Sequence, residues 1–260
     1  TVDLSILARS TPGFTGADIA NMVNEAALFA SRKGKKNIDM KDFEYAKDKV
    51  LMGTERRSMI ISDEEKKITA YHEAGHALIA ARAKDADPLH KVSIIPRGMA
   101  LGVTQQLPLN DKYIYKKKHL EAQLCVLLAG RIAEEVFLDF VTTGAGSDFE
   151  KATDIARKMV CEWGMSSLGP IKYGQKDDML FLGRDMLYHS EYSEDTAQKI
   201  DREIEKIIDN AYQNAKSMIL DNRDKLEAIA NRLLDQESLS AEDIDVILGD
   251  GKKQAGSSVK

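Results

Sequence analysis

Apolar residues recur along this chain mainly at intervals of three and four, the spacing that gives an α-helix one buried face. A long example runs from Ala197 to Ala215, with isoleucines between them at helical spacing. Residues suited to cap a helix, including Thr15, Asp39 and Ser62, precede several of these stretches. We therefore predict helices over residues 15–32, 39–52, 62–87, 116–140, 148–163, 193–220, 222–234 and 241–248.

Two short runs rich in β-branched residues interrupt the helical pattern. Residues 92–95 and 102–106 are separated by Pro96-Arg97-Gly98, a turn sequence, so we expect a small hairpin or edge strands there. Loops are expected over residues 107–115 and 164–192, where little periodicity remains. The predicted fold class is mainly α, with one short β-hairpin.

The composition is that of an ordinary soluble globular protein, since 43% of the 260 residues are hydrophobic and 30% are charged. The longest apolar run, residues 124–129, is far shorter than the ~20 residues that span a bilayer, and no signal peptide is evident. Two cysteines, Cys125 and Cys161, are too few for a disulfide framework and favour a reducing compartment. A formal net charge of −5 argues against nucleic-acid binding through a basic surface.

The segment His72-Glu73-Ala74-Gly75-His76 carries the residue types of a metal site. In a helix, the i, i+4 spacing puts both imidazoles on one face, where they can hold one zinc ion. Glu73 can take a proton from zinc-bound water and deliver it to a departing amine. The pattern therefore indicates hydrolysis of an amide bond.

This five-residue pattern also occurs by chance, so a helix without metal is the alternative. Its position in a capped helix among apolar residues favours a metal site, because burying two histidines and a carboxylate without one is unfavourable. Gly75 is a poor helix former, which indicates close approach of another backbone at that position.

A catalytic zinc needs a third protein ligand, and Arg82 stands where metzincins have a third histidine. Two carboxylate candidates remain: the pair Glu134 and Glu135, and Asp148 after the glycine-rich turn at 142–147. Asp148 is equally suited to cap a helix, so spacing leaves the third ligand open. The remaining histidines lack a partner motif and are assigned ordinary polar roles: His90, His119 and His189.

Four motifs in this order resemble the FtsH family of membrane-anchored, ATP-dependent AAA+ zinc metalloproteases. They are HEAGH at 72–76, IPRG at 95–98, LAGRIAEE at 128–135 and TTGAGSD at 142–148. In addition, TPGFTGAD at 11–18 and NEAA at 24–27 resemble the small helical lid that ends an AAA+ module. The resemblance covers about residues 1–240.

The resemblance implies that His72, His76 and Asp148 hold one zinc ion per chain and that Glu73 is the catalytic base. It makes Glu134 and Glu135 surface groups or supporting groups able to orient a ligand histidine. It also implies an edge strand within residues 92–106, to which an unfolded polypeptide substrate adds as an extra strand.

The same resemblance divides the chain into an AAA+ lid at 1–58, a zinc metalloprotease domain at 59–249 and a disordered tail at 250–260. The sequence contains no phosphate-binding loop, no Walker B run and no membrane span, and it starts at Thr1 without methionine. We therefore expect a soluble fragment whose parent has the ATPase core, with its ATP and Mg²⁺, and the membrane anchor upstream. The parent is expected to be a homo-hexamer in a bacterial inner membrane, with the protease facing the cytoplasm and no nucleic-acid partner.

The expected function is a zinc-dependent endopeptidase for unfolded or membrane proteins, coupled in the parent to ATP-driven unfolding and translocation. One alternative is an inactive helical scaffold or oligomerisation module with a degenerate motif, against which the intact Glu73 argues. Another is a peptidase unrelated to AAA+ proteins, against which the lid-like segment argues.

Overall fold

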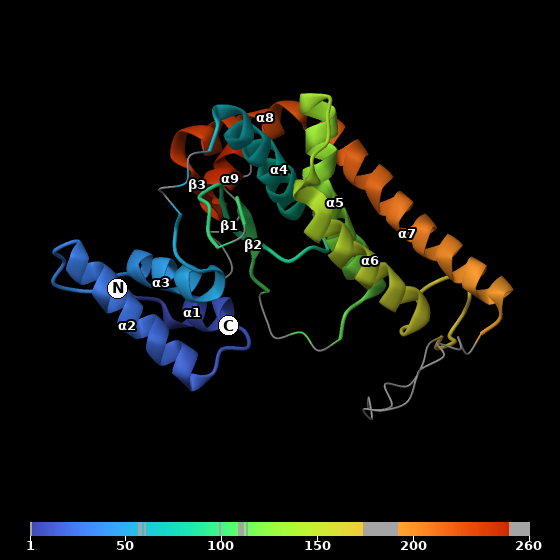
Figure 1. The fold of residues 1–260 in the computed structure, drawn as a ribbon, viewed down its shortest axis with the longest axis horizontal. Helices are drawn as coiled ribbons and strands as arrows, with labels where there is room; N and C mark the ends of the chain where they lie inside the picture. Colours follow the sequence, from blue (N-terminus) through green and yellow to red (C-terminus); the bar gives the residue numbers. More distant parts are fainter. Residues whose placement is uncertain are drawn as a thin grey trace.

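The computed structural model describes residues 2–249 apart from 57, 58, 60, 99, 109–111, 113 and 174–191. Over these residues it confirms a mainly helical fold with one small sheet (Figure 1). The elements in chain order are α1 (Leu4–Ser10), α2 (Gly16–Arg32), α3 (Met40–Met52), α4 (Asp63–Arg82), β1 (Leu89–Ser93), β2 (Val103–Gln106), α5 (Lys117–Leu138), the short 3₁₀ helix η1 (Thr143–Ala145), α6 (Gly146–Cys161), α7 (Glu194–Asp221), α8 (Arg223–Gln236), β3 (Ser238–Ser240) and α9 (Ala241–Leu248).

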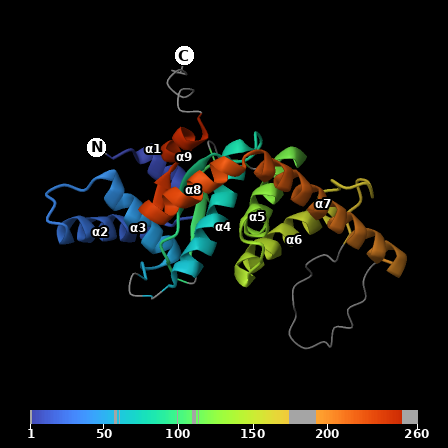
Figure 2. The same cartoon turned by 90° about the horizontal axis from the view of Figure 1, so that it is seen from above.

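Helices α1–α3 form a group to one side of the other elements in both views (Figures 1 and 2). Both α2 and α3 begin with a capping box, in which the cap side chain and the third helical residue satisfy each other's backbone N–H groups. A small apolar core of Met22, Ala26 and Ala46 joins them. Helix α1, which the sequence pattern did not predict, has its first N–H groups capped by Asp3.

Helix α4 is the centre of the larger group. It begins at a capping box between Ser62 and Glu65, as predicted, and three acidic residues in its first turn complement the helix dipole. It packs against α5 on one side and α8 on another, while α7 runs along α5 (Figure 2). Ten of the eleven residues from Ala70 to Ala80 are consequently buried, and the chemistry-bearing motif lies in that stretch.

The sheet has three antiparallel strands in the order β2-β1-β3, rather than the two of the predicted hairpin. Val92 of β1 pairs with Thr104 of β2 and with Leu239 of β3. Strand β1 is therefore central, so the expectation of an edge strand within 92–106 holds only for β2. Strand β3 is three residues long and comes from the far end of the chain, so local sequence could not predict its pairing.

Helix α6 begins earlier than predicted. Its cap position is Ala145, whose side chain makes no capping hydrogen bond, and Gly146 is the first helical residue. Asp148 therefore lies inside the first turn, and the interpretation of Asp148 as a simple N-cap is wrong. The predicted tail at 250–260, His189 and most of the predicted loop at 164–192 lie outside the described residues.

None of the helices in the described ranges combines the length and apolar character needed to cross a membrane.

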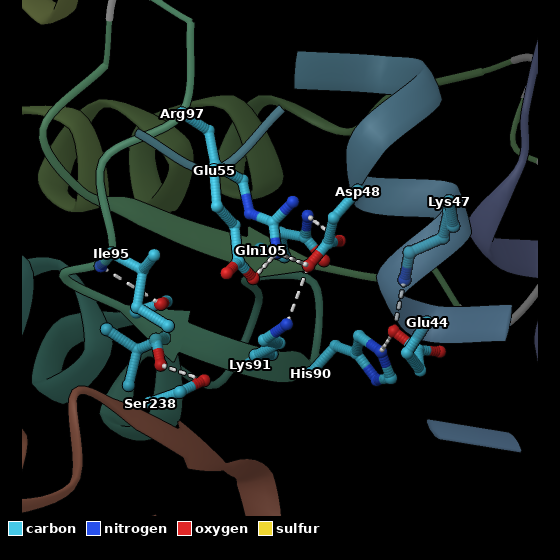
Figure 3. A network of polar contacts seen from close by, with 12 residues as sticks. Glu44, Lys47, Asp48, Glu55, His90, Lys91, Ile95, Arg97, Gln105 and Ser238 are labelled. Atoms are coloured by element: carbon cyan, nitrogen blue, oxygen red, sulfur yellow. Dashed lines mark hydrogen bonds and ion pairs between the residues drawn. The ribbon is translucent and has the colours of Figure 1, made fainter. Parts of the chain in front are cut away.

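Charged side chains join α3 and the segment after it to the sheet (Figure 3). Lys91 Nζ lies 2.7 Å from Asp48 Oδ2, and Arg97 Nη2 lies 2.6 Å from Glu55 Oε1. Gln105 of β2 donates its amide to Asp48 Oδ1 at 3.3 Å. Arg97 and Asp48 are both buried, so the contact between the N-terminal helices and the sheet depends on paired charges.

Candidate metal centre

Helix α4 brings the two motif histidines together on one face. His72 and His76 are one helical turn apart, and their Nε2 atoms lie 3.0 Å from each other. Both rings are removed from solvent, with His76 only 7% exposed, because α5 covers this face of α4. Two imidazole nitrogens thus meet in a largely dry environment.

Two glycines allow α5 to pass this close. A Cβ on Gly75 would lie 2.5 Å from the Ala129 carbonyl oxygen, so only glycine permits the observed approach of α5. The prediction of a close backbone contact at Gly75 is confirmed. A Cβ on Gly130 would lie 2.6 Å from Nε2 of both His72 and His76, so any side chain there would fill the space between the imidazoles.

Asp148 reaches the same point from the first turn of α6. Its Oδ2 lies 3.4 Å from His72 Nε2 and 3.5 Å from His76 Nε2. These three atoms form a compact group that could hold a metal ion. The structure thus brings Asp148, one of the two carboxylate candidates, to the Nε2 side of both histidines.

The other candidate pair separates into two different roles. Glu134 is fully buried, and its Oε1 lies 2.7 Å from Nδ1 of His72, on the side of the ring away from Asp148. Its second oxygen accepts the backbone N–H of Thr142 at 2.8 Å. Glu135 instead accepts hydrogen bonds from Tyr212 and Arg131 and has no contact with the histidines.

The partners of the Nδ1 atoms determine which atoms face the cluster. His76 Nδ1 lies 2.7 Å from the Val126 carbonyl oxygen, which can only accept, so this nitrogen carries the hydrogen. The carboxylate of Glu134 likewise accepts from His72 Nδ1. In the neutral rings both Nε2 atoms therefore present lone pairs toward each other and toward the carboxylate of Asp148.

Either a proton or a metal cation would balance this convergence of acceptors. Burial disfavours charge on His72, but hydrogen bonds to Asp148 and Glu134 outweigh it and raise the pKa of His72 to about 9. Burial would also raise the pKa of Asp148, yet the two histidines hold it far below its usual range. The pKa of Glu134 is lowered as well, because contacts with His72 and Thr142 overcome its burial.

The separations in the cluster fit a zinc ion. Nitrogen and oxygen ligands at roughly 2.0–2.2 Å from a tetrahedral zinc lie about 3.3 Å apart. The observed separations of 3.0, 3.4 and 3.5 Å are close to that value. Two imidazoles and one carboxylate are also a common donor set for zinc, and three protein ligands leave one position open.

The other residues that the sequence singled out differ in their relation to this cluster. Glu73 is 7% exposed, and its Oε2 accepts the hydroxyl hydrogen of Thr104 on β2 at 2.6 Å. His90 and His119 make contacts with Glu44 and with the Asp85 carbonyl, away from the cluster. The sequence interpretation missed Thr104 and Gly130, although a glycine inside a predicted helix was a signal for close packing at 130.

Two imidazoles and a carboxylate, converging from α4 and α6, make this cluster a candidate site for a single metal ion. A family model for peptidase family M41 matches residues 59–247, and a model for the AAA+ lid domain matches residues 1–45. The chain therefore belongs to peptidase family M41.

Similar proteins bear the name ATP-dependent zinc metalloprotease FtsH. One from Acidobacterium capsulatum is 58% identical over 247 residues, which cover 95% of this chain and 39% of the relative. FtsH 4 of Sorangium cellulosum is 55% identical over 251 residues, covering 95% of this chain and 39% of the relative. FtsH 2 of Methylacidiphilum infernorum is 53% identical over 251 residues, which cover 96% of this chain and 39% of the relative. The chain thus spans about two fifths of the length of the curated relatives it matches.

Proposed function

We propose that this chain is a zinc-dependent endopeptidase in which His72, His76 and Asp148 hold the metal. The observation that carries the proposal is the convergence of two lone-pair nitrogens and a carboxylate oxygen at zinc-ligand separations. When bound, zinc polarises the scissile carbonyl and lowers the pKa of a coordinated water to about 7. The acceptors are largely removed from solvent, with 12% of the His72 side chain and 17% of the Asp148 side chain exposed, so a cation is a better partner for them than bulk water.

Glu73 is the general base of the proposed reaction. It follows His72 directly on α4, interacts with it electrostatically, and is not one of the three clustered ligands. Glu73 takes a proton from the attacking water and passes it to the leaving amine, which opens the peptide bond. The scaffold alternative is disfavoured, because a degenerate site has no need of an intact carboxylate beside a complete ligand set.

The proposed substrate is an unfolded polypeptide that adds to β2. Within the described part of the chain, β2 pairs with β1 on one side and with no strand on the other. A peptide joining that edge would be held by backbone hydrogen bonds, so recognition would depend weakly on sequence. The bond between Thr104 and Glu73 means that such a peptide would lie beside the catalytic carboxylate.

For the protein as a whole, we propose an ATP-dependent protease in which residues 1–58 are the AAA+ lid and 59–249 the protease domain. The lid match and the name of the relatives support this, and the chain's share of their length leaves room for an ATPase core that binds ATP and Mg²⁺. The homo-hexameric assembly, the anchor in a bacterial inner membrane and the cytoplasmic orientation of the protease belong to the same proposal.

Zinc content and hydrolysis of an unfolded protein test the proposal. The native chain and Glu73→Gln should each bind about one zinc, and only the native chain should cleave. Asp148→Ala should lose zinc, while Glu135→Ala, the matched control on α5, should keep both zinc and activity. A native chain that is free of zinc after purification without chelators would overturn the proposal, and cleavage by Glu73→Gln would remove the assigned base.

A further inference from the structure

Two residues at the start of β2 contact the Glu73 carboxylate: Thr104 within the strand and Gly102 just before it. The Thr104 hydroxyl has a single hydrogen, and at 2.6 Å from Glu73 Oε2 it is directed to that oxygen. The backbone carbonyl of Glu73 lies farther from the same hydroxyl, at 3.4 Å. A hydrogen bond to a buried carboxylate is stronger than one between neutral groups, so it can fix the side chain.

The other oxygen of Glu73 lies against Gly102. A Cβ at position 102 would be 2.6 Å from Oε1 and 2.7 Å from Cγ of Glu73. Any other residue there would push the carboxylate away from its observed position. Glycine at 102 therefore leaves Oε1 in place, and Thr104 holds Oε2.

We propose that Thr104 is a positioning residue for the general base, fixing one carboxylate oxygen of Glu73 so that the other faces the attacking water. The inference rests on the proposed role of Glu73. Glutamate has three side-chain torsions, and a proton acceptor must lie within hydrogen-bond reach of the proton it takes. Thr104 is itself fixed, because it pairs with Val92 inside the sheet.

Among the described residues, the strand that contacts Glu73 is also a strand with one unpaired edge. Thr104 lies within β2, between Val103 and Gln105. A peptide that added to the edge of β2 would therefore run alongside the residue that positions Glu73. Loss of the Thr104 hydroxyl should lower kcat, because the hydroxyl acts on Glu73, and should leave KM unchanged, because a peptide would bind the backbone of β2.

The test compares Thr104→Val, which keeps the shape but loses the hydroxyl, with Thr104→Ser, which keeps the hydroxyl. Both are made in the zinc-loaded native chain and in Glu73→Gln. The first readout is calorimetric binding of a peptide hydroxamate, which binds zinc and gives its proton to a neighbouring carboxylate. The second is kcat and KM on an unfolded protein, with zinc content and thermal unfolding measured for every variant.

Thr104→Val should weaken hydroxamate binding and lower kcat by about 10- to 100-fold, with zinc content and KM unchanged. Thr104→Ser should restore both, and Thr104→Val should have no further effect in Glu73→Gln, because the hydroxyl acts through that carboxylate. Gly102→Ala, which displaces Glu73 while leaving Thr104 in place, should cause a similar loss and serves if Thr104→Val does not fold.

Native-like hydroxamate binding and kcat in Thr104→Val would overturn the inference. It would also be overturned if Thr104→Val weakened hydroxamate binding as much in Glu73→Gln as in the native chain. Failure of the proposed function looks different. In that case Glu73→Gln would itself bind hydroxamate and cleave like the native chain, or the native chain would bind no zinc. Either result removes the general base, and the inference with it.

Discussion

Replacing Glu134 with glutamine would remove the negative charge behind His72 while preserving the shape of the side chain. Glu134 is completely buried, and its two oxygens accept from His72 Nδ1 and from the Thr142 backbone N–H. Glutamine has a single oxygen, so it can satisfy only one of these donors, and its NH₂ group then faces the other. The substitution therefore disturbs both the orientation of the imidazole and the turn after α5.

The expected magnitude follows from these contacts. A hydrogen bond to a charged group contributes about 1.5–3 kcal/mol, and a buried donor without a partner costs about 1–3 kcal/mol. Groups that orient metal-bound histidines change metal affinity by about 10- to 100-fold when mutated. We expect zinc affinity to fall by about that factor, and the free energy of unfolding of the metal-free chain to fall by about 1–3 kcal/mol.

Competition with a chromophoric chelator measures the zinc affinity, and urea unfolding of the metal-free chain measures the stability. Glu135→Gln is the matched control, because Glu135 is the next residue of α5 but contacts Tyr212 and Arg131 instead of a histidine. Its zinc affinity should equal that of the native chain. Equal affinities for Glu134→Gln and the native chain would refute the reasoning that the Nδ1 partner governs metal binding.

Three further outcomes are expected. Zinc affinity should rise as pH increases toward 9, because the pKa of His72 without a metal is about 9 and its proton must leave when zinc binds. Calorimetry in buffers of different ionisation enthalpy should detect this proton release, and binding heats that do not depend on the buffer would contradict it. Gly75→Ala should lower the free energy of unfolding by about 1–3 kcal/mol through overpacking against Ala129, and a stabilised variant would show that helix propensity dominates instead. Arg97→Met should speed amide exchange in α3, because it removes the ion pairs of Arg97 with Asp48 of α3 and with Glu55 just after it. Unchanged exchange would show that these pairs do not hold α3 against the rest of the fold.

Helices that carry their own start signals could be predicted from the sequence. The capping residues Thr15, Asp39, Ser62, Ser193 and Ser240 all precede helices in the structure. The elements that were missed are short, among them α1, which has a local cap at Asp3, and β3, whose pairing partner is distant in sequence. Strand β3 exists because three residues at the far end of the chain pair with β1, and no local pattern encodes that contact.

From residue spacing, the candidate site was predictable only as far as it depends on one helix, and Asp148 was expected as third ligand only from the family resemblance. The i, i+4 spacing on α4 determines that His72 and His76 share a face, whatever the rest of the fold does. The distinction between Glu134 and Glu135 depends on about 100° of rotation around α5, and hence on how α5 packs against α4. The position of Asp148 depends on the path of the chain between α5 and α6, which spacing alone does not determine.

The raised pKa of His72 and the fit to zinc have a single physical origin. Both depend on the packing of α4, α5 and α6, which holds the carboxylates of Asp148 and Glu134 beside the imidazoles in a largely buried space. Gly130 keeps that space clear, and the contacts to the Val126 carbonyl and Glu134 turn the acceptor atoms inward. A proton on His72 neutralises part of this repulsion at one atom, whereas a divalent ion at the centre neutralises it at all three. Under the proposed assignment, a zinc ion would compensate these converging acceptors, and its affinity would then depend on how these helices pack.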